Sequence, residues 1–355
     1  MYPDEFEAYI DELIGKENDN KNKKSTKTKK KKYDLVKWEE IDRSKDYISN
    51  WKPKEKSNIA LIYAVGGIMS GESRKGSAGS TVMGDKTISK AIKSARENKN
   101  IDAIVLRIDS GGGSALASDQ MWRQIDLTTN NPDKTKNKPF IASMSDIAAS
   151  GGYYIACNAD KIIADEATIT GSIGVIGLSF NTSKLLRKFG INKEIIVKQG
   201  EHSDFYTGSR LRNAYEIDKI EKSIEDSYET FKQRVIDGRK GLINAETIDE
   251  IAMGRVWTGR KAKEVNLIDE VGGLNDAIML AAEEAKIEDL DNINIIEYPR
   301  KDIAEKLKNI SGKKRSNLLD TIPSELLDDY ADLITLSEMS KEGPIMITPI
   351  KIEIK

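Results

Sequence analysis

A serine followed by two glycines is the first candidate for chemistry. Ser150, Gly151 and Gly152 come directly before the apolar run 153–156 and follow a strand-like segment at 140–143. A serine at the first turn of a helix lies beside unpaired backbone N–H groups and the positive end of the helix dipole, which suits a nucleophile. The competing interpretation is that Ser150 is only an N-cap, a position where serine is strongly preferred. Local features alone favour the cap.

Two other turns are rich in small residues. The turn DSGGGS at 109–114 joins a predicted strand at 103–108 to a predicted helix, and TGSIG follows at 170–174. Successive glycines let backbone N–H groups face a ligand that side chains would otherwise block. The alternative for the first turn is a tight strand-to-helix connection. It has neither the lysine and spacing of a P-loop nor the spacing of a dinucleotide-binding loop.

The cysteine and histidine content limits the possible chemistry. The only histidine is His202, so a triad within the chain would have to use it. The only cysteine, Cys157, lies in the apolar run after Ser150, and we interpret it as packing. One cysteine builds neither a disulfide framework nor a metal cluster. We therefore expect no metal and no cofactor.

The composition is that of a soluble globular protein. Of 355 residues, 32% are charged and 38% hydrophobic, and the net charge of −2 gives no general affinity for nucleic acid. The lysine-rich run 21–32 predicts a flexible linker, which we favour over a contact with anionic lipid or RNA. The sequence shows neither an apolar run of about 18 residues nor a signal peptide. Taken alone, and with Met1 as the true start, the chain is expected in the cytoplasm.

Strand and helix patterns alternate from residue 57 onward. A strong strand at 59–65 is followed by helical and strand patterns in turn, which predicts parallel βα units. A long helix at 216–238 has an apolar face along its whole length, formed by Ile217, Ile220, Ile224, Tyr228, Phe231 and Val235.

The flanking regions are simpler. Residues 1–56 comprise an amphipathic helix at 2–14, the lysine-rich linker and a lead-in. Residues 286–355 form a carboxy-terminal extension with short apolar strands, such as 293–296 and 345–352, and no recognisable chemistry.

Four motifs, in order, resemble the signal peptide peptidase A (protease IV) family of serine peptidases. They are DSGGGS at 109–114, SMSDIAASGGYYI at 143–155, TGSIGVIG at 170–177 and GRVWTG at 254–259. The resemblance covers roughly residues 57–285, which would be the peptidase domain. The first 57 residues resemble the end of the amino-terminal half of the family's long, duplicated form, with the linker into its carboxy-terminal half.

The resemblance implies an α/β fold, a ClpP/crotonase-like spiral of ββα units with flanking helices. It also implies a Ser/Lys dyad. By position, Ser150 matches the nucleophile, Gly112 and Gly113 match the oxyanion hole, and Ser172 matches a serine that orients the lysine. A lysine base must be neutral at the working pH, which requires desolvation and no carboxylate partner.

The general base departs from the family pattern. Where the short form has its lysine, this chain has Ser203. In the long form the carboxy-terminal half likewise has the serine and lacks the lysine, which comes from the amino-terminal half. This chain resembles that carboxy-terminal half. Lys193, Lys198 and His202 are nearby substitutes for the base, each less favoured than a separate half.

The resemblance therefore implies a serine endopeptidase that degrades signal-peptide remnants or other apolar segments. It would form a homo-oligomer, receive its lysine from an amino-terminal half, and associate through a partner with the periplasmic or outer face of the cell membrane, without nucleic acid. One alternative is a non-catalytic or conditionally active assembly subunit. Another is a crotonase-type acyl-CoA hydratase, which leaves ASGGY followed by TGSIG unexplained.

Overall fold

The computed structural model describes residues 57–299 and 344–347, apart from 77–79, 135–136, 193–195, 197–199, 201, 203 and 206–209. These residues belong to one compact unit, Lys54–Lys355. The predicted helix at 2–14, the lysine-rich run and most of the predicted strand at 194–197 lie outside the described residues.

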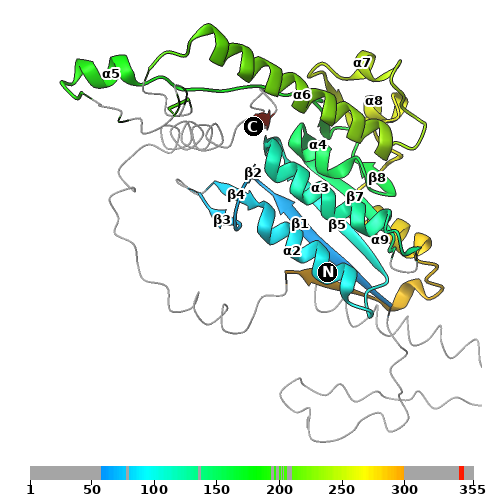
Figure 1. Ribbon diagram of the computed structural model, residues 1–355. Helices are drawn as coiled ribbons and strands as arrows, with labels where there is room; N and C mark the ends of the chain where they lie inside the picture. The colour runs from blue at the N-terminus through cyan, green and yellow to red at the C-terminus, as the bar shows by residue number, and fades with distance from the viewer. Residues whose placement is uncertain are drawn as a thin grey trace, which may run out of the picture. The chain divides into compact units, whose positions relative to one another are not determined.

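A large, mainly parallel sheet forms the centre of this unit (Figure 1). Its strand order is β10-β9-β7-β5-β1-β12, with β8 paired to β7 and β11 to β8, and only β10 is antiparallel to its neighbour. The predicted parallel βα organisation is thus confirmed. The strands are β1 (Ser57–Val65), β5 (Ala103–Ser110), β7 (Phe140–Ala149), β8 (Lys161–Ala164), β9 (Ile169–Gly171), β10 (Val256–Thr258), β11 (Glu270–Val271) and β12 (Ile293–Tyr298).

A second, smaller sheet has the order β13-β6-β2-β4-β3. The chain moves from β1 and from β5 into short strands of this sheet and then into a helix, which makes successive ββα units. The expected spiral of such units is confirmed. The strands of this sheet are β2 (Gly67–Met69), β3 (Arg74–Lys75), β4 (Thr81–Gly84), β6 (Gly112–Ser114) and β13 (Ile345–Ile347).

Helices cover both faces of the large sheet (Figure 1). Side chains alternate along a strand, so Ala60 and Ile62 join the core cluster of one face while Ile59 and Leu61 join that of the other. The first face packs against α2 (Asp85–Glu97), α3 (Ala115–Thr129) and α4 (Gly151–Ala156), and the second against α9 (Leu274–Glu284).

The predicted packing role of Cys157 is confirmed. Its side chain is fully buried directly after α4, and burial raises the pKa of the thiol to about 12. A protonated, enclosed thiol is a poor nucleophile.

The long helix α6 (Ala214–Gly238) begins with a capping box formed by Asn213 and Glu216. Phe231 and Val235 are buried, as the apolar pattern predicts, but Ile217 is 46% exposed. The predicted inner face is therefore wrong for Ile217, whereas Ile220 and Ile224 are half-buried and lie against Gly177. The first half of α6 extends with α5 (Ser183–Lys188) beyond the central sheet (Figure 1), and the main core packs against the second half.

Residues beyond 285 contribute to both sheets. β12 extends the large sheet beside β1, and β13 extends the small sheet beside β6. The domain boundary at residue 285 stays a prediction. The remaining short elements are α7 (Ile248–Ile251), α8 (Gly259–Glu264) and the 3-10 turn η4 (Leu290–Asn292). Over the described ranges, none of the helices has the length and apolar character that crossing a bilayer demands.

Candidate active site

Ser150 lies between β7 and α4 in a conformation that serine rarely adopts. Its φ is 52° and its ψ is −117°, and a positive φ is uncommon for a residue with a side chain. The backbone is held from both sides, since its N–H donates to the Gly171 carbonyl at 2.8 Å and its carbonyl accepts from the Tyr154 N–H at 2.9 Å. The surrounding structure thus maintains a strained residue.

The Ser150 hydroxyl is buried and has no hydrogen-bond partner among the residues that the structure describes. The residue is 1% exposed, and its Oγ makes no cap bond to α4. The simple capping interpretation is therefore wrong. A buried, unsatisfied polar atom costs about 1–3 kcal/mol, and strain of this kind costs a similar amount. Such costs concentrate at functional sites.

The TGSIG turn holds Ser150 from one side. β9 pairs with β7 so that Gly171 lies opposite Ala149, and the Thr170 hydroxyl donates to the Ala148 carbonyl at 2.7 Å. Ser172, predicted to orient a lysine, is 3% exposed and has a φ of 49°. It directly follows Gly171, the residue whose carbonyl holds the Ser150 N–H.

The GRVWTG segment supports this turn in its place. β10 runs antiparallel to β9, with Val256 opposite Gly171. The Ser172 N–H donates to the Arg255 carbonyl at 2.7 Å. The TGSIG and GRVWTG motifs thus pair with each other, and together they fix the Gly171 carbonyl that binds the Ser150 N–H.

The glycine turn lies against the two residues that follow Ser150. A Cβ atom on Gly112 would lie 2.7 Å from the Gly151 nitrogen, and one on Gly152 would lie 2.4 Å from the Ser110 carbonyl oxygen. Gly113 is equally confined, because a Cβ there would lie 2.1 Å from the Ile68 carbonyl oxygen. The two turns approach so closely that only glycine fits.

The structure brings the strand with the predicted oxyanion glycines beside the turn that follows Ser150. The Gly112 N–H donates to the Ser110 hydroxyl at 3.1 Å, and that hydroxyl donates to the Gly66 carbonyl at 2.7 Å. Gly113 lies one residue further along β6, opposite Met346 of β13. The oxyanion role of both glycines stays a prediction. Nothing in the local sequence of β13 indicates its pairing with β6, so its place beside these glycines was not predicted.

His202 belongs to an ion cluster at the start of α6 that also contains Asp204, Arg210 and Glu216. The Arg210 guanidinium donates to both carboxylates at 2.6–2.8 Å, and His202 Nδ1 lies 2.9 Å from Glu216 Oε1. No hydrogen bond joins His202 to Ser150, whose hydroxyl has no partner in the described part of the chain. The other positions considered for the base, Lys193, Lys198 and Ser203, lie outside the described residues.

This cluster predicts an acid-sensitive stability. Hydrogen bonds from Arg210 hold the pKa of Glu216 far below its ordinary value and also lower that of Asp204. The unfolded chain then binds more protons than the folded one below an unperturbed glutamate pKa of about 4.3. The stabilisation is present above that pH and is lost as the pH falls toward the lowered folded-state pKa.

We expect Glu216→Gln to lower the Tm at pH 7 and to weaken the dependence of Tm on pH between pH 6 and pH 3.5. Thermal melts across this range measure both effects. Glu225→Gln, at an exposed position on the same helix, is the matched control and should keep the original acid dependence. An unchanged acid slope in Glu216→Gln would contradict the role of the cluster.

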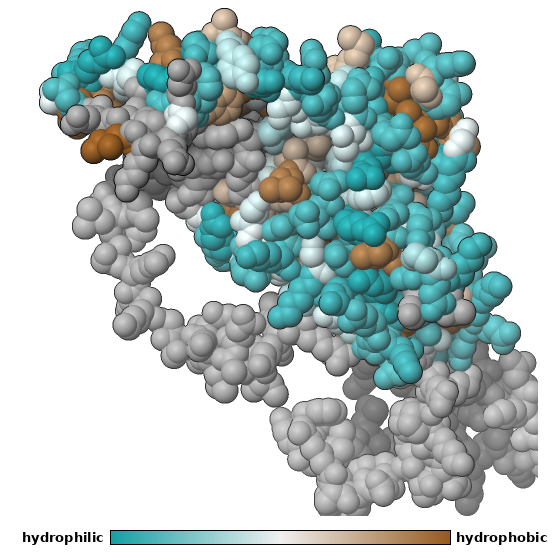
Figure 2. Space-filling view, in the orientation of Figure 1, coloured by the Kyte–Doolittle hydropathy of each residue, from teal (hydrophilic) through white to brown (hydrophobic). Residues whose placement is uncertain are grey.

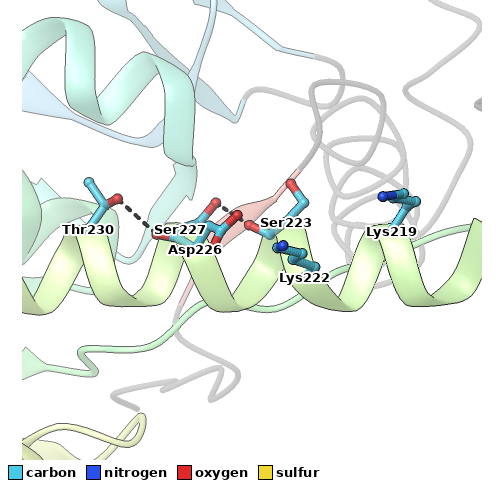
Figure 3. Close-up of a pocket in the computed structure, with 6 residues that line it drawn as sticks. All are labelled: Lys219, Lys222, Ser223, Asp226, Ser227 and Thr230. Atoms are coloured by element: carbon cyan, nitrogen blue, oxygen red, sulfur yellow. Dashed lines mark hydrogen bonds between the residues drawn. The ribbon is translucent and has the colours of Figure 1, made fainter.

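A cavity of about 350 Å³ lies along α6 (Figure 3). The hydroxyls of Ser227 and Thr230 donate to backbone carbonyls of the same helix at 2.7 and 2.8 Å. None of the candidate site residues lines this cavity, so we assign no chemistry to it. Its lining residues are Lys219, Lys222, Ser223, Asp226, Ser227 and Thr230.

The described residues thus form a spiral of ββα units with a strained, unbonded serine at a strand-to-helix turn and a glycine strand beside it. This is the arrangement of a serine hydrolase with the ClpP/crotonase-like fold.

Comparisons with known proteins specify the class. Residues 132–288 match peptidase family S49. The chain is 40% identical to the chloroplastic serine protease SPPA of Arabidopsis thaliana, over 69% of this chain and 35% of that protein. It is 34% identical to a Synechocystis sp. protein described as a protease, slr0021, over 70% of this chain and 83% of that protein. The solved structure of a ClpP1 mutant from Listeria monocytogenes aligns with a TM-score of 0.39 and 17% identity, over 62% of this chain and 94% of that one.

The chain belongs to peptidase family S49, the signal peptide peptidase A (protease IV) family of serine peptidases. The expected family is thereby confirmed. The chain spans only about 35% of the length of the plant protease.

Proposed function

We propose that this chain is the serine-bearing half of an endopeptidase that works by a Ser/Lys dyad, with Ser150 as the nucleophile. The observation that carries the proposal is the Ser150 hydroxyl, which is buried, makes no hydrogen bond to any described residue and stands on a backbone held at a φ of 52°. A lone hydroxyl held in this way is ready to attack a carbonyl once a base removes its proton.

The proposed reaction has two stages. A neutral lysine takes the proton as Ser150 Oγ attacks the peptide carbonyl carbon, and the amine leaves with that proton, which gives an acyl-enzyme. Water, activated by the same lysine, then hydrolyses the ester. The backbone at Gly112 and Gly113 would stabilise the negative oxygen in both stages, an effect of a few kcal/mol per donor.

The lysine is proposed to come from a separate amino-terminal half. The sequence supports this, since Ser203 occupies the expected lysine position. The surface offers a place for further subunits, because none of the α5 residues is buried and Leu185 and Phe189 are 56% and 71% exposed. Figure 2 shows hydrophobic side chains at the end of the molecule where Figure 1 places α5, on an otherwise mostly hydrophilic face. We propose that these side chains contact other copies of this chain or the missing half.

The proposed substrates are signal-peptide remnants and other extended apolar segments. Access to them would come through a membrane-anchored partner at the periplasmic or outer face of the membrane.

The test is reconstitution. The chain is assayed with a quenched fluorescent apolar peptide, alone and together with the amino-terminal half from the same genome, using as a control a half whose lysine is replaced by methionine. Turnover only with the intact half is expected. Equal turnover by the isolated chain would point to a local base. No turnover in any mixture would favour the non-catalytic assembly subunit.

A further inference from the structure

Ser110 is a buried serine at the end of β5, where that strand leads into the glycine turn. It is 2% exposed. Its hydroxyl donates to the Gly66 carbonyl at 2.7 Å and accepts from the Gly112 N–H at 3.1 Å. A serine hydroxyl has one donor and two acceptor sites, so it serves both partners at once. Ser110 therefore links the turn between β1 and β2 to the strand that carries the predicted oxyanion glycines.

The glycine turn has little stiffness of its own. Gly111, Gly112 and Gly113 follow one another, and the last two have φ values of 105° and 155°. Glycine loses more conformational freedom on folding than any other residue, so such a turn keeps one conformation only where its surroundings hold it. Backbone donors stabilise a transition state best when they are fixed in advance. An oxyanion site built from this turn thus depends on an anchor.

Ser110 also lies next to the turn that carries Ser150. The pairing of β5 with β7 shifts after Ile108, and this shift brings Ser110 opposite Ala148, two residues before Ser150. Irregular pairing, as in β-bulges, re-aims side chains beside active sites. A Cβ atom on Gly152 would lie 2.4 Å from the Ser110 carbonyl oxygen. The backbone of Ser110 is thus close to one turn of the candidate site, while its hydroxyl holds the other.

The acceptor of the Ser110 hydroxyl is itself firmly held. The Gly66 N–H donates to the Asp109 carbonyl at 2.9 Å, so the N–H and the carbonyl of Gly66 bond to two consecutive residues of β5. A Cβ atom on Gly66 would lie 2.1 Å from the Thr81 carbonyl oxygen, and Gly66 therefore has little room to move toward β4. The Ser110 hydroxyl is thus attached to a rigid support.

We propose that Ser110 is a positioning residue of the peptidase site. Its hydroxyl fixes the peptide plane before Gly112 and so keeps the backbone of the glycine turn aligned with Ser150. This inference rests on the proposed peptidase function and adds to it a residue that does not itself touch the substrate. Without the hydroxyl, the Gly112 N–H loses its acceptor, and the turn samples conformations in which its donors point elsewhere.

Steady-state kinetics of the reconstituted enzyme test this role. The full chain with Ser110→Ala is combined with the amino-terminal half and assayed with the quenched fluorescent peptide. We expect kcat to fall by about tenfold or more and KM to change by less than about threefold, because the loss affects the transition state and not the bound substrate. Ser110→Thr, which keeps the hydroxyl, should recover most of kcat.

The matched control is Thr128→Val. Thr128 is fully buried near the end of α3, and its hydroxyl donates to the Gln124 carbonyl at 2.8 Å. The variant therefore also removes a buried hydroxyl that has a backbone partner. It should lower the Tm, as Ser110→Ala does, and leave kcat unchanged. A comparable loss of kcat in both variants would show that Ser110 acts only through general stability, and would overturn the proposal.

Hydrogen exchange, followed by NMR on the isotope-labelled chain, provides a measurement that needs no catalysis. In Ser110→Ala the Gly112 N–H should exchange about tenfold faster or more, because its protecting hydrogen bond is lost. The Ser150 N–H, which donates to the Gly171 carbonyl, should stay slow. Faster exchange at Gly112 with an unchanged kcat would overturn the proposal, as would unchanged exchange. If the parent mixture shows no turnover, the proposed function fails by itself, and exchange at Gly112 still decides whether Ser110 holds the turn.

Discussion

Replacing Ser150 with alanine is expected to abolish turnover in the reconstituted enzyme, with a loss of about 10⁴-fold or more. The hydroxyl is the only part of this residue that alanine removes, and it makes no hydrogen bond within the described structure. The fold should therefore be retained, and the free energy of unfolding should not fall, because the hydroxyl that is removed is buried and unsatisfied. Peptide hydrolysis measures the first effect, and urea denaturation measures the second.

The variant Ser150→Gly separates the catalytic role of the hydroxyl from the backbone strain at this position. It should lose as much turnover as Ser150→Ala, but its free energy of unfolding should be higher than that of the alanine variant by about 1 kcal/mol, because glycine tolerates positive φ. The backbone at Ser150 has a φ of 52°. Equal stability of the two variants would contradict a strained nucleophile. Substantial residual turnover in either would contradict its catalytic role.

Gly112→Ala is expected to reduce turnover by about 10²- to 10³-fold, the effect of disturbing an oxyanion site. The added methyl group would lie 1.9 Å from the Met346 oxygen and 2.7 Å from the Gly151 nitrogen. It would therefore collide with the β13 backbone and press on the turn that holds Ser150.

The matched control for this variant is Gly71→Ala. Gly71 has a φ of 107°, close to the 105° of Gly112, but a Cβ there meets nothing within 4 Å. Both variants carry the cost of positive φ, about 1 kcal/mol or more, and only Gly112→Ala adds the clash. Turnover and thermal melts compare the two. Similar losses in both would show that the space at Gly112 is unimportant.

The sequence predicted much of this site because its residues lie in short, ordered motifs. The turns at 109–114 and 170–174 and the serine at 150 all follow strands of one sheet, and parallel βα units bring the ends of such strands together. The strand predicted at 140–143 continues to Ala149, however, because its later residues pair with β9. Pairing with a strand twenty residues later leaves no local pattern.

Two features of the site depend on tertiary structure alone and could not be predicted from the sequence. Whether Ser150 caps a helix or presents a free hydroxyl depends on its backbone angles, which the residue type does not specify. Similarly, the pairing of Met346 with Gly113 joins segments more than 230 residues apart. The apolar pattern of 345–352 predicts a strand but does not identify its partner.

The most direct test is to map the adduct of a fluorophosphonate probe by mass spectrometry, in the chain combined with its amino-terminal half. One modified residue is expected, Ser150, and labelling should be lost in Ser150→Ala and when the lysine of the amino-terminal half is replaced. Labelling at another serine, or none at Ser150 with the intact half present, would contradict it.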